Sequence, residues 1–400
     1  MQSRFMGWTF DQFAEKLQSD LPLLAQFSAT EQDAGWHGEG NVAVHTNLVL
    51  QETYALIVGD ASHLSVEQQD VLILSALLHD YGKPLTTRRR EKDGMERVVA
   101  PHHELMGASL LFSCYPIFHL TASQWQQVIQ LVAYHDQPKK LVYMNKSEAD
   151  YRALSRTIPS MELIYLLEVA DRRGTVSDDY EKQLEMLEVF KLFSQELGIW
   201  QSPAYQGLRT RIATHFDGED PLFVDAAYHK GMDALDRGEI YQEDEVMALA
   251  YGNKGKSHVI IMCAISGSGK STYIEQHLPG YVHISPDEIR ETVIKNRADV
   301  KHHGQAFAQA HEQMKVALRE GKNVVWDATN TRIDFRSKIV SAAKKYGAYV
   351  EIVLIQSALH RSLRNNQQRK HRIPDEIIRR QAQKFQLPQL SEAHRLTWIA

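Results

Sequence analysis

The amino-acid sequence predicts a multidomain protein in which an all-α domain precedes an α/β domain with a parallel sheet. The chain has 400 residues, whereas a single hydrophobic core stops growing at roughly 250–300 residues. The N-terminal residues carry apolar side chains at three- and four-residue spacings, the pattern of amphipathic helices. From Lys256 onward, short apolar runs alternate with amphipathic segments, which is typical of a parallel sheet with crossover helices.

The clearest helical patterns cover residues 66–79, 103–114, 123–135 and 161–172. The expected strands are the runs VIIMCAI, YVHIS, NVVWDAT and YVEIVLI, each followed by a helical segment. Between these parts, residues 217–245 hold ten acidic and two basic residues, which is most simply a solvated face. We therefore expect a helical domain over 1–180, an acidic helical connector over 181–255 and an α/β domain over 256–400.

Composition indicates an ordinary globular protein. At 43% hydrophobic and 24% charged residues, the chain is neither disordered nor collagen-like. The longest apolar runs, 71–78 and 259–265, are far shorter than the roughly 18 residues of a membrane span, and the first residues show no apolar signal core. Cys114 and Cys263 are the two cysteines, which fits a reducing compartment. We therefore expect a cytoplasmic protein without a membrane partner.

Charge is distributed unevenly between the two halves of the chain. Residues 1–255 hold 22 basic and 37 acidic side chains, whereas residues 256–400 hold 23 basic and 13 acidic ones. Such an asymmetry suggests that the basic half meets a polyanion. The C-terminal half is therefore the candidate for contact with nucleic acid.

A glycine-rich loop follows the first expected strand of the α/β domain and opens a helix. Its glycines let the backbone wrap around phosphate oxygens, and N–H groups at a helix start attract anions. Lys270 would reach the β- and γ-phosphates, and the Ser271 hydroxyl would bind Mg²⁺. Ala264 stands where the first glycine is usual, so we expect a slightly altered loop; a chance Gly/Ser turn is the alternative. The expected ATP-binding residues of the loop are Ser266, Gly267, Ser268, Gly269, Lys270, Ser271 and Thr272.

Polar residues follow the next two expected strands. Asp287 and Arg290 are three residues apart, so on a helix they share a face. A carboxylate there can deprotonate an attacking hydroxyl, and a guanidinium can bind an acceptor phosphate; the alternative is an exposed salt bridge. Asp327 follows the third strand, where a P-loop enzyme places a carboxylate near the metal or the acceptor.

Basic residues gather between positions 361 and 380. In a transferase such a segment can fold over the donor phosphates as a lid, whereas as a surface feature it would be a solubilising helix. The basic residues of the segment are Arg361, Arg364, Arg369, Lys370, Arg372, Arg379 and Arg380.

The C-terminal 145 residues resemble the 5'-hydroxyl polynucleotide kinase family in the motifs G-S-G-K-S-T, D-x-x-R, a D-T-N-like element and an arginine-containing lid before a proline. The resemblance implies that Asp287 is the general base and that Arg290 contacts the acceptor phosphate. Arg364 and Arg369 would be lid arginines that bind ATP, although the second could equally fall at Gln368. Lys270 and Ser271 would hold ATP and Mg²⁺.

Histidines and acidic residues recur through the helical domain. Single histidines in helices mostly pack or lie at the surface. Imidazole and carboxylate ligands nevertheless suit first-row transition metals, and helical proteins build metal sites between helices. The candidates are His45, His79, Asp80, His102, His103, Glu104, His135, Asp136 and Asp171.

This pattern resembles the HD phosphohydrolase superfamily, whose signature is H…HD…D. Over roughly residues 40–180 the likeness extends to the HD domain of bacterial tRNA nucleotidyltransferases, in the elements L-L-H-D-x-G-K-P, H-E-x-x-G-A and A-D-x-x-G. We find nothing resembling a nucleotidyltransferase head before it, so we do not expect a CCA-adding enzyme.

The resemblance implies two metal positions. The ligands of the first would be His45, His79, Asp80 and Asp171. His103 and His135 could hold a second ion, with Asp80 bridging, and Lys83 would face a substrate phosphate, so that Asp80 and Lys83 are the catalytic candidates. His102 competes with His103, but the H-E-x-x-G-A context favours His103.

Together the two halves resemble the bacterial HD-polynucleotide-kinase end-healing proteins. This implies a phosphoesterase on 2',3'-cyclic or 2'/3'-phosphate ends and a kinase on 5'-hydroxyl ends of RNA or DNA. The implied cofactors are ATP or another NTP with Mg²⁺, and one or two ions of Mn, Co, Ni, Cu, Zn or Fe. A separate ligase is a possible partner. The alternatives are an HD nucleotidase fused to a nucleoside or small-molecule kinase, and a non-catalytic RNA-binding module.

Overall fold

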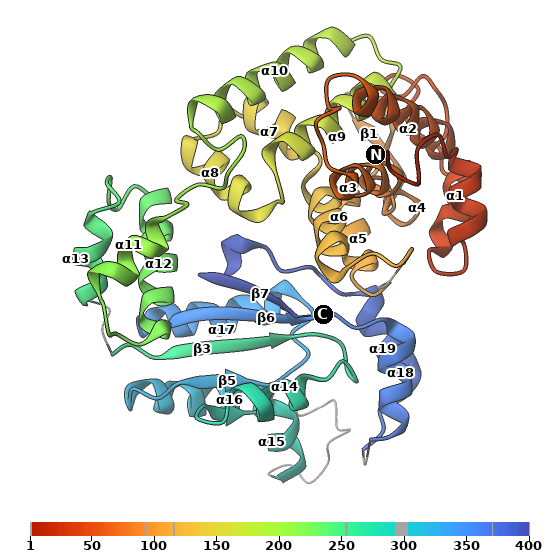
Figure 1. Cartoon of the computed structure of the whole chain (residues 1–400). Coiled ribbons are helices and arrows are strands. Elements are labelled where there is room, and N and C mark those ends of the chain that lie inside the picture. Colours follow the sequence, from red (N-terminus) through yellow and green to blue (C-terminus); the bar gives the residue numbers. More distant parts are fainter. Residues whose placement is uncertain are drawn as a thin grey trace. The chain divides into compact units, whose positions relative to one another are not determined.

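The computed structural model describes residues 2–92, 94–114, 117–252, 255–292, 303–369 and 371–399. The chain divides into two compact units, Met1–Ala204 and Tyr205–Ala400. The first is helical and the second contains a five-stranded parallel sheet, so the predicted fold class is confirmed (Figure 1). Lys370, one of the basic residues of the expected lid, lies outside the described residues.

The helices of the first unit surround a buried central helix. Its elements are α1 (Phe10–Leu17), η1 (Pro22–Ala29), α2 (Val42–Val58), α3 (Val66–Leu78), α4 (Lys83–Thr86), β1 (Arg88–Lys92), β2 (Met95–Val99), α5 (His103–Leu111), α6 (Ala122–Tyr134), α7 (Gln137–Tyr143), α8 (Glu148–Thr157), α9 (Met161–Arg173) and α10 (Tyr180–Glu196). A capping box of Ser65 and Gln68 begins α3. From Gln69 to its end α3 is buried, and it packs against α2, α6 and α9.

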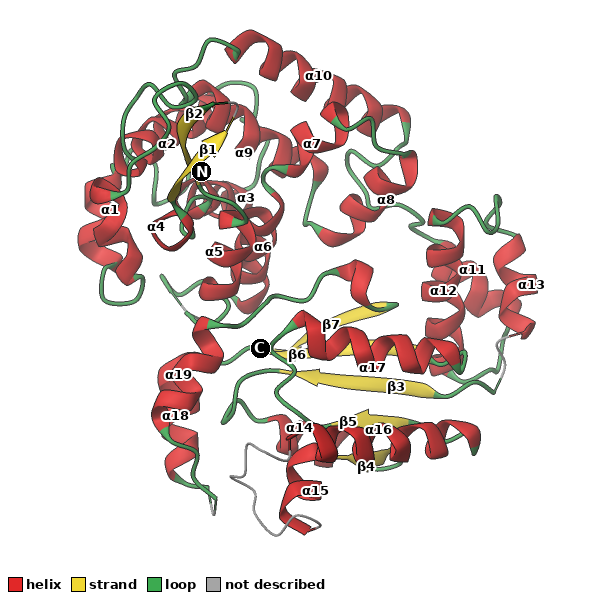
Figure 2. Cartoon of the chain, turned by 180° about the vertical axis from the view of Figure 1, so that it is seen from behind, coloured by secondary structure: helices red, strands yellow, loops and turns green. Residues whose placement is uncertain are grey.

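The short antiparallel hairpin β1–β2 is not among the predicted elements (Figure 2). Its first strand reads RRREK, which offers no apolar alternation from which a strand could be predicted. At the surface of the hairpin, Arg89 pairs with both Glu31 and Glu96.

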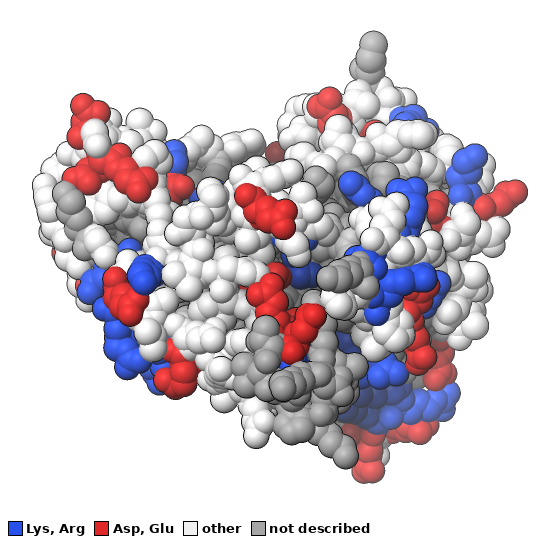
Figure 3. All heavy atoms as spheres, turned by 90° about the horizontal axis from the view of Figure 1, so that it is seen from below, with Lys and Arg blue, Asp and Glu red and all other residues white. Residues whose placement is uncertain are grey.

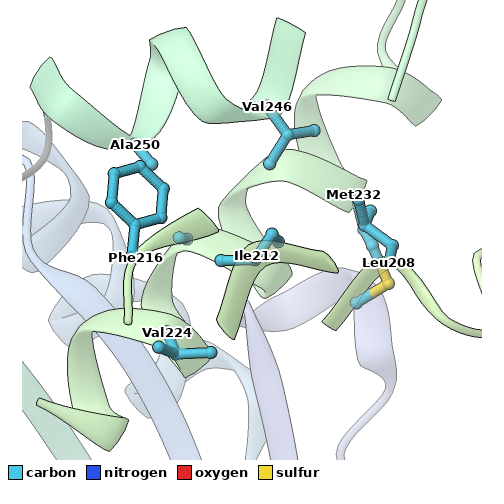
Figure 4. Close-up of a cluster of buried hydrophobic side chains, with 8 residues drawn as sticks. Leu208, Ile212, Phe216, Val224, Met232, Val246 and Ala250 are labelled. Atoms are coloured by element: carbon cyan, nitrogen blue, oxygen red, sulfur yellow. The ribbon is translucent and has the colours of Figure 1, made fainter. Parts of the chain in front are cut away.

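Three helices open the second unit: α11 (Leu208–His215), α12 (Pro221–Asp236) and α13 (Glu245–Gly252). They enclose a small core of their own, in which Ile212, Phe216 and Val246 are buried together (Figure 4). The segment 181–255 that we expect as one connector is therefore divided. Its first helix, α10, packs on α7 and α9 of the first unit, whereas α11–α13 belong to the second.

The α/β part of the second unit places its strands in the order β4-β5-β3-β6-β7, all parallel. Its elements are β3 (His258–Cys263), α14 (Lys270–His277), β4 (Val282–Ile284), α15 (Pro286–Thr292), α16 (His303–Arg319), β5 (Val324–Trp326), α17 (Ile333–Lys345), β6 (Tyr349–Ile355), α18 (Leu359–Gln367), α19 (Asp375–Gln383), η3 (Leu390–Glu392) and β7 (Arg395–Ile399). Every residue of β3 and β6 is buried, as expected for strands covered on both faces. Their carboxyl ends meet at one edge, where α/β proteins bind ligands.

Within the described ranges, every helix is too short or too polar to span a lipid bilayer.

Candidate functional site

The first unit brings together side chains that lie in, or directly after, five helices. His79 and Asp80 follow α3, His103 opens α5, and His135 follows α6. His45 in α2 and Asp171 in α9 complete the group. All six predicted ligands therefore gather in one place, although 126 positions of sequence separate the first from the last.

His45, His79 and Asp80 form one cluster whose ligand atoms all lie within 4.8 Å of one another. The Nε2 atoms of His45 and His79 are 3.2 Å apart. Asp171 belongs to the same cluster, because its Oδ1 lies 3.0 Å from Nε2 of His45 and 3.7 Å from Nε2 of His79. This is the ligand set expected for a first metal.

Asp80, His103 and His135 form a second cluster with the same 4.8 Å limit. Asp80 joins the two clusters, since its Oδ1 lies 3.2 Å from Nε2 of His103 while its Oδ2 lies 3.3 Å from Nε2 of His79. His102, the competing ligand, is exposed at the N-cap of α5 in a left-handed conformation and has no part in either cluster.

The Nδ1 atom of each clustered histidine faces an oxygen atom. Nδ1 of His79, His103 and His135 lies 2.8 Å from the carbonyl oxygen three residues earlier in each case. Nδ1 of His45 lies 2.9 Å from Oε1 of Glu39. In the tautomer in which Nδ1–H donates to these oxygens, Nε2 is the unprotonated nitrogen that a metal requires. The sequence analysis missed Glu39, which no motif marks.

Two glycines let the helices approach closely enough to form the clusters. A Cβ atom on Gly82 would lie 2.1 Å from the carbonyl oxygen of His103 and 2.7 Å from the backbone nitrogen of Gly107. A Cβ atom on Gly174, after α9, would lie 2.7 Å from the backbone nitrogen of Val49 in α2. These contacts explain why glycine stands at positions 82 and 174. Gly82 lets α5 lie close to Asp80, and Gly174 lets α9 lie close to α2, which carries His45.

The buried carboxylates of the two clusters favour positive charge beside them. Burial lowers the pKa of His79, whereas the Asp80 and Asp171 carboxylates raise it. The carboxylates have the larger effect, so the pKa of His79 rises to about 9. Burial instead lowers the pKa of His135 to about 4. Despite burial, His79 and Lys83 hold the pKa of Asp80 well below its usual range. Anchored imidazoles and buried carboxylates are a donor set that fits divalent transition metals.

A cavity of about 310 Å³ opens beside the clusters. Lys83, Lys139 and Arg172 contribute positive charge to its wall. Nζ of Lys83 lies 2.7 Å from Oδ2 of Asp80 and donates to Gln32 at 2.6 Å. The predicted cation therefore borders the same cavity as the candidate ligands, where it can meet an anionic group.

The phosphate-binding loop of the second unit joins β3 to α14. Gly267 and Gly269 have φ angles of 84° and 104°, which glycine adopts readily. A Cβ atom on Gly267 would lie 2.3 Å from the carbonyl oxygen of Ser362, so α18 packs directly on the loop. Asn365 of α18 also donates to the Gly267 carbonyl at 2.9 Å.

Lys270 lies folded into its own loop. Its ammonium donates to the carbonyls of Ala264 and Ile265, at 3.3 and 3.0 Å. Burial lowers the pKa of Lys270 to about 8, helped by Arg369 and opposed by Asp327. These charge effects mean that the two predicted residues Asp327 and Arg369 lie near Lys270. Ser271 and Thr272 are exposed on the first turn of α14.

The predicted acceptor residues lie after β4 and β5. Asp287 and Arg290 form an ion pair on α15, so they do share a face. The pair is not an exposed surface bridge, because Arg290 is buried. Asp327 follows β5 and lies 3.1 Å from Nε2 of His283 on β4. This histidine stands at the second residue of a three-residue strand, and no sequence signal marks it.

The basic segment forms α18, the following turn and α19. Arg364 is exposed on α18, and Arg369 lies in the turn. Buried Asn366 ties this turn together, since it donates to the Ile373 carbonyl at 2.6 Å and accepts from the Ile373 N–H at 3.1 Å. Figure 3 shows Lys and Arg side chains at several places on one face of the molecule, with Asp and Glu side chains among them.

Comparison with known families identifies one part of the chain. Residues 259–388 match a family model described as an AAA domain, of a P-loop kinase-like type. The match begins in β3 and ends after α19, so it contains the loop, Asp287, Asp327 and the basic segment. The second unit therefore holds a P-loop domain consistent with a kinase-type enzyme, which binds a nucleotide with Mg²⁺.

Proposed function

We propose that the chain is a bifunctional enzyme that heals nucleic-acid ends. The first unit would be a metal-dependent phosphoesterase acting on 2',3'-cyclic phosphate or 2'/3'-phosphate ends. The second would phosphorylate 5'-hydroxyl ends of RNA or DNA with ATP. The observation that carries the proposal is the convergence of four imidazole Nε2 atoms and two carboxylates beside a cavity whose lining includes two lysines and an arginine, in a chain that also holds a kinase-type P-loop domain.

In the first unit, the residues suit an HD-type phosphoesterase. The candidate ligands of one ion are His45, His79, Asp80 and Asp171, and those of a second are Asp80, His103 and His135. Bound ions of this kind neutralise phosphate charge and lower the pKa of a coordinated water. Asp80 would hold both ions, because each of its oxygens faces a different cluster. Lys83 would bind a phosphate oxygen from its position beside Asp80.

In the second unit, the residues suit phosphoryl transfer to a hydroxyl. The loop amides and Lys270 would bind the donor phosphates, and Ser271 would bind Mg²⁺. Asp287 would take the proton of the attacking hydroxyl. Its ion pair with Arg290 keeps the proposed base and the proposed acceptor-binding residue together on one face of α15. Arg290 would also meet the acceptor phosphate, and the arginines of the basic segment would close over ATP.

The two activities form one chemical sequence. Transesterification of RNA leaves a 2',3'-cyclic phosphate on one fragment and a 5'-hydroxyl on the other, and a ligase that requires a 3'-hydroxyl and a 5'-phosphate can join neither. Removing the first phosphate and adding one to the second end restores ends that can be sealed. Two such activities on one polypeptide would serve both sides of the same break.

End-group analysis of labelled oligonucleotides tests the proposal. We expect ATP and Mg²⁺ to support phosphorylation of a 5'-hydroxyl oligonucleotide, and Mn²⁺ to support loss of a terminal 2',3'-cyclic phosphate after chelation and dialysis. Phosphorylation of free nucleosides in preference to the oligonucleotide would favour the small-molecule kinase instead. Failure to turn over ATP with any acceptor would indicate a non-catalytic module.

A further inference from the structure

Trp36 is a large aromatic side chain on the wall of the cavity that holds the candidate metal ligands. Its surface is 39% exposed, whereas most aromatic side chains of the first unit are buried. The next residue, His37, also lines the cavity, and its ring centroid lies 5.1 Å from that of His45. The indole therefore borders the same cavity as the candidate metal ligands. The residue that follows it, His37, packs against His45 of the first cluster.

The segment that carries Trp36 is fixed from both sides. Buried Asp33 accepts from Arg97 at 2.8 Å, from the Val98 N–H at 3.1 Å and from the Gly35 N–H at 3.0 Å, which ties the segment to β2. On the other side, the Gly38 N–H donates to the Val176 carbonyl at 2.8 Å. The guanidinium of Arg97 also lies 5.1 Å from the centre of the Trp36 ring. The indole is therefore held in place before any ligand arrives.

The cavity has the size and charge for one nucleotide. Its volume of about 310 Å³ is at the lower end of the range for small-ligand sites. Three cationic side chains of the wall suit phosphate groups, and each forms an ion pair with a carboxylate. The pairs are Lys83 with Asp80, Lys139 with Glu168 and Arg172 with Asp171. A phosphate would be drawn to the metal ligands and these cations. An aromatic ring on the same wall suits a planar, uncharged group.

We infer that Trp36 is a stacking platform for the base of the terminal nucleotide whose phosphate is hydrolysed. The inference rests on the proposed phosphoesterase function of the first unit and adds a specificity element to it. The site would then select phosphate esters that carry a nucleobase over esters of the same charge without one. Stacking of a base on an aromatic side chain is tolerant of base identity, so all four bases should be accepted.

A cycle of two enzymes and two substrates tests this. The substrates are one oligonucleotide with a 3'-phosphate and a matched oligonucleotide whose terminal residue has no base. The enzymes are the wild-type chain and Trp36→Ala, both reloaded with Mn²⁺. We expect the wild type to prefer the base-carrying end by roughly tenfold in kcat/KM, through KM, and the variant to lose this preference. Trp36→Phe should keep most of it.

Tyr143→Ala is the matched control, because Tyr143 is 78% exposed and does not line the cavity; it should keep the full preference. Metal content and unfolding temperature establish that Trp36→Ala is loaded and folded. Equal loss on both substrates, or an unchanged preference, would overturn the platform while leaving the phosphoesterase in place. A wild-type protein that hydrolyses neither oligonucleotide would instead contradict the proposed function.

Discussion

His45 differs from the other clustered histidines in what holds its Nδ1 atom. The other three face the backbone carbonyl three residues earlier in the chain, whereas His45 faces the carboxylate of Glu39. Glu39 also lies 2.8 Å from Nδ1 of His37 and accepts from the Val176 N–H at 2.9 Å. One buried carboxylate thus orients a ligand and links the segment before α2 to the residues after α9.

We predict that Glu39→Ala weakens metal binding by roughly 10- to 100-fold, because the carboxylate raises the basicity of the ligand and fixes its orientation. The metal affinity of Glu39→Gln should lie between those of Glu39→Ala and the wild type, because an amide oxygen still accepts a hydrogen bond but carries no charge. Competition with a chromogenic chelator measures the affinity. Glu15→Ala, at an exposed position of α1, serves as the control. Wild-type affinity in Glu39→Ala would contradict this role.

At the scale of elements, the second cluster depends on how closely α5 approaches the turn after α3. Gly82 has a φ angle of −83°, which any residue can adopt, so the requirement for glycine there is one of space alone. We predict that Gly82→Ala displaces α5 and separates His103 from Asp80, because its Cβ would overlap the His103 carbonyl.

The bound metal per chain, measured after reloading and dialysis, should therefore fall in Gly82→Ala. Gly252→Ala is the control, since its Cβ would meet no atom within 4 Å. An unchanged metal content in a folded Gly82→Ala protein would show that α5 can shift without losing the site.

His394 connects β7 to the rest of the sheet through an unprotonated nitrogen. Its Nδ1 accepts the Val350 N–H at 3.0 Å, and burial, with Lys344 and Lys230 nearby, lowers its pKa to about 3. A histidine whose pKa is lowered on folding stabilises the fold above pH 6.5, and this stability is lost as the pH falls toward 3.

We therefore predict that the wild type loses about 1–2 kcal/mol more than His394→Asn between pH 7 and pH 5. Asparagine retains an acceptor oxygen and does not titrate. Urea unfolding followed by fluorescence at both pH values measures the difference. Equal losses in the two proteins would mean that His394 titrates in the folded state as it does in the unfolded one.

The sequence predicts the helices around the metal ligands well because their periodicity and caps agree. The expected helix over 66–79 is observed as Val66–Leu78, and that over 161–172 as Met161–Arg173. The prediction is poorer where the charge of a segment does not reflect the burial of its apolar residues. The acidic residues of 217–245 indicate a solvated connector, yet buried Val224 and Met232 in the same stretch build a core with α11 and α13.

Parts of the candidate sites could not be predicted because they depend on tertiary contacts. Motifs point to four of the six candidate metal ligands, His79, Asp80, His103 and Asp171, since each lies in a recognisable pattern of neighbours. His45 and His135 lie in no such element, and only the resemblance to the superfamily implies them. Glu39 and His283 lie in no such pattern, and their roles follow from the folded positions of His45 and Asp327. Trp36 likewise could not be singled out from the sequence, because the hairpin β1–β2 brings Arg97 against it only in the folded protein.

On the scale of the whole molecule, the two candidate sites lie in different compact units. The candidate metal ligands of the first unit lie within Met1–Ala204, and the phosphate loop lies within Tyr205–Ala400. We predict that Lys270→Ala abolishes 5' phosphorylation and leaves phosphoesterase activity near that of the wild type, and that Asp80→Ala has the reverse effect. Both activities are followed on one doubly labelled oligonucleotide. Loss of both in a folded single variant would contradict independent sites.

The packing of α18 on the phosphate loop sets an order of events during synthesis. Every candidate metal ligand of the first unit precedes residue 172, so this unit can fold while the ribosome is still translating the second. The loop at 266–272 is translated long before Ser362 and Asn365, which contact Gly267, and before β7, which completes the sheet. The candidate metal ligands of the first unit can therefore come together before Ser362, Asn365 and β7, which complete the surroundings of the phosphate loop, have been translated.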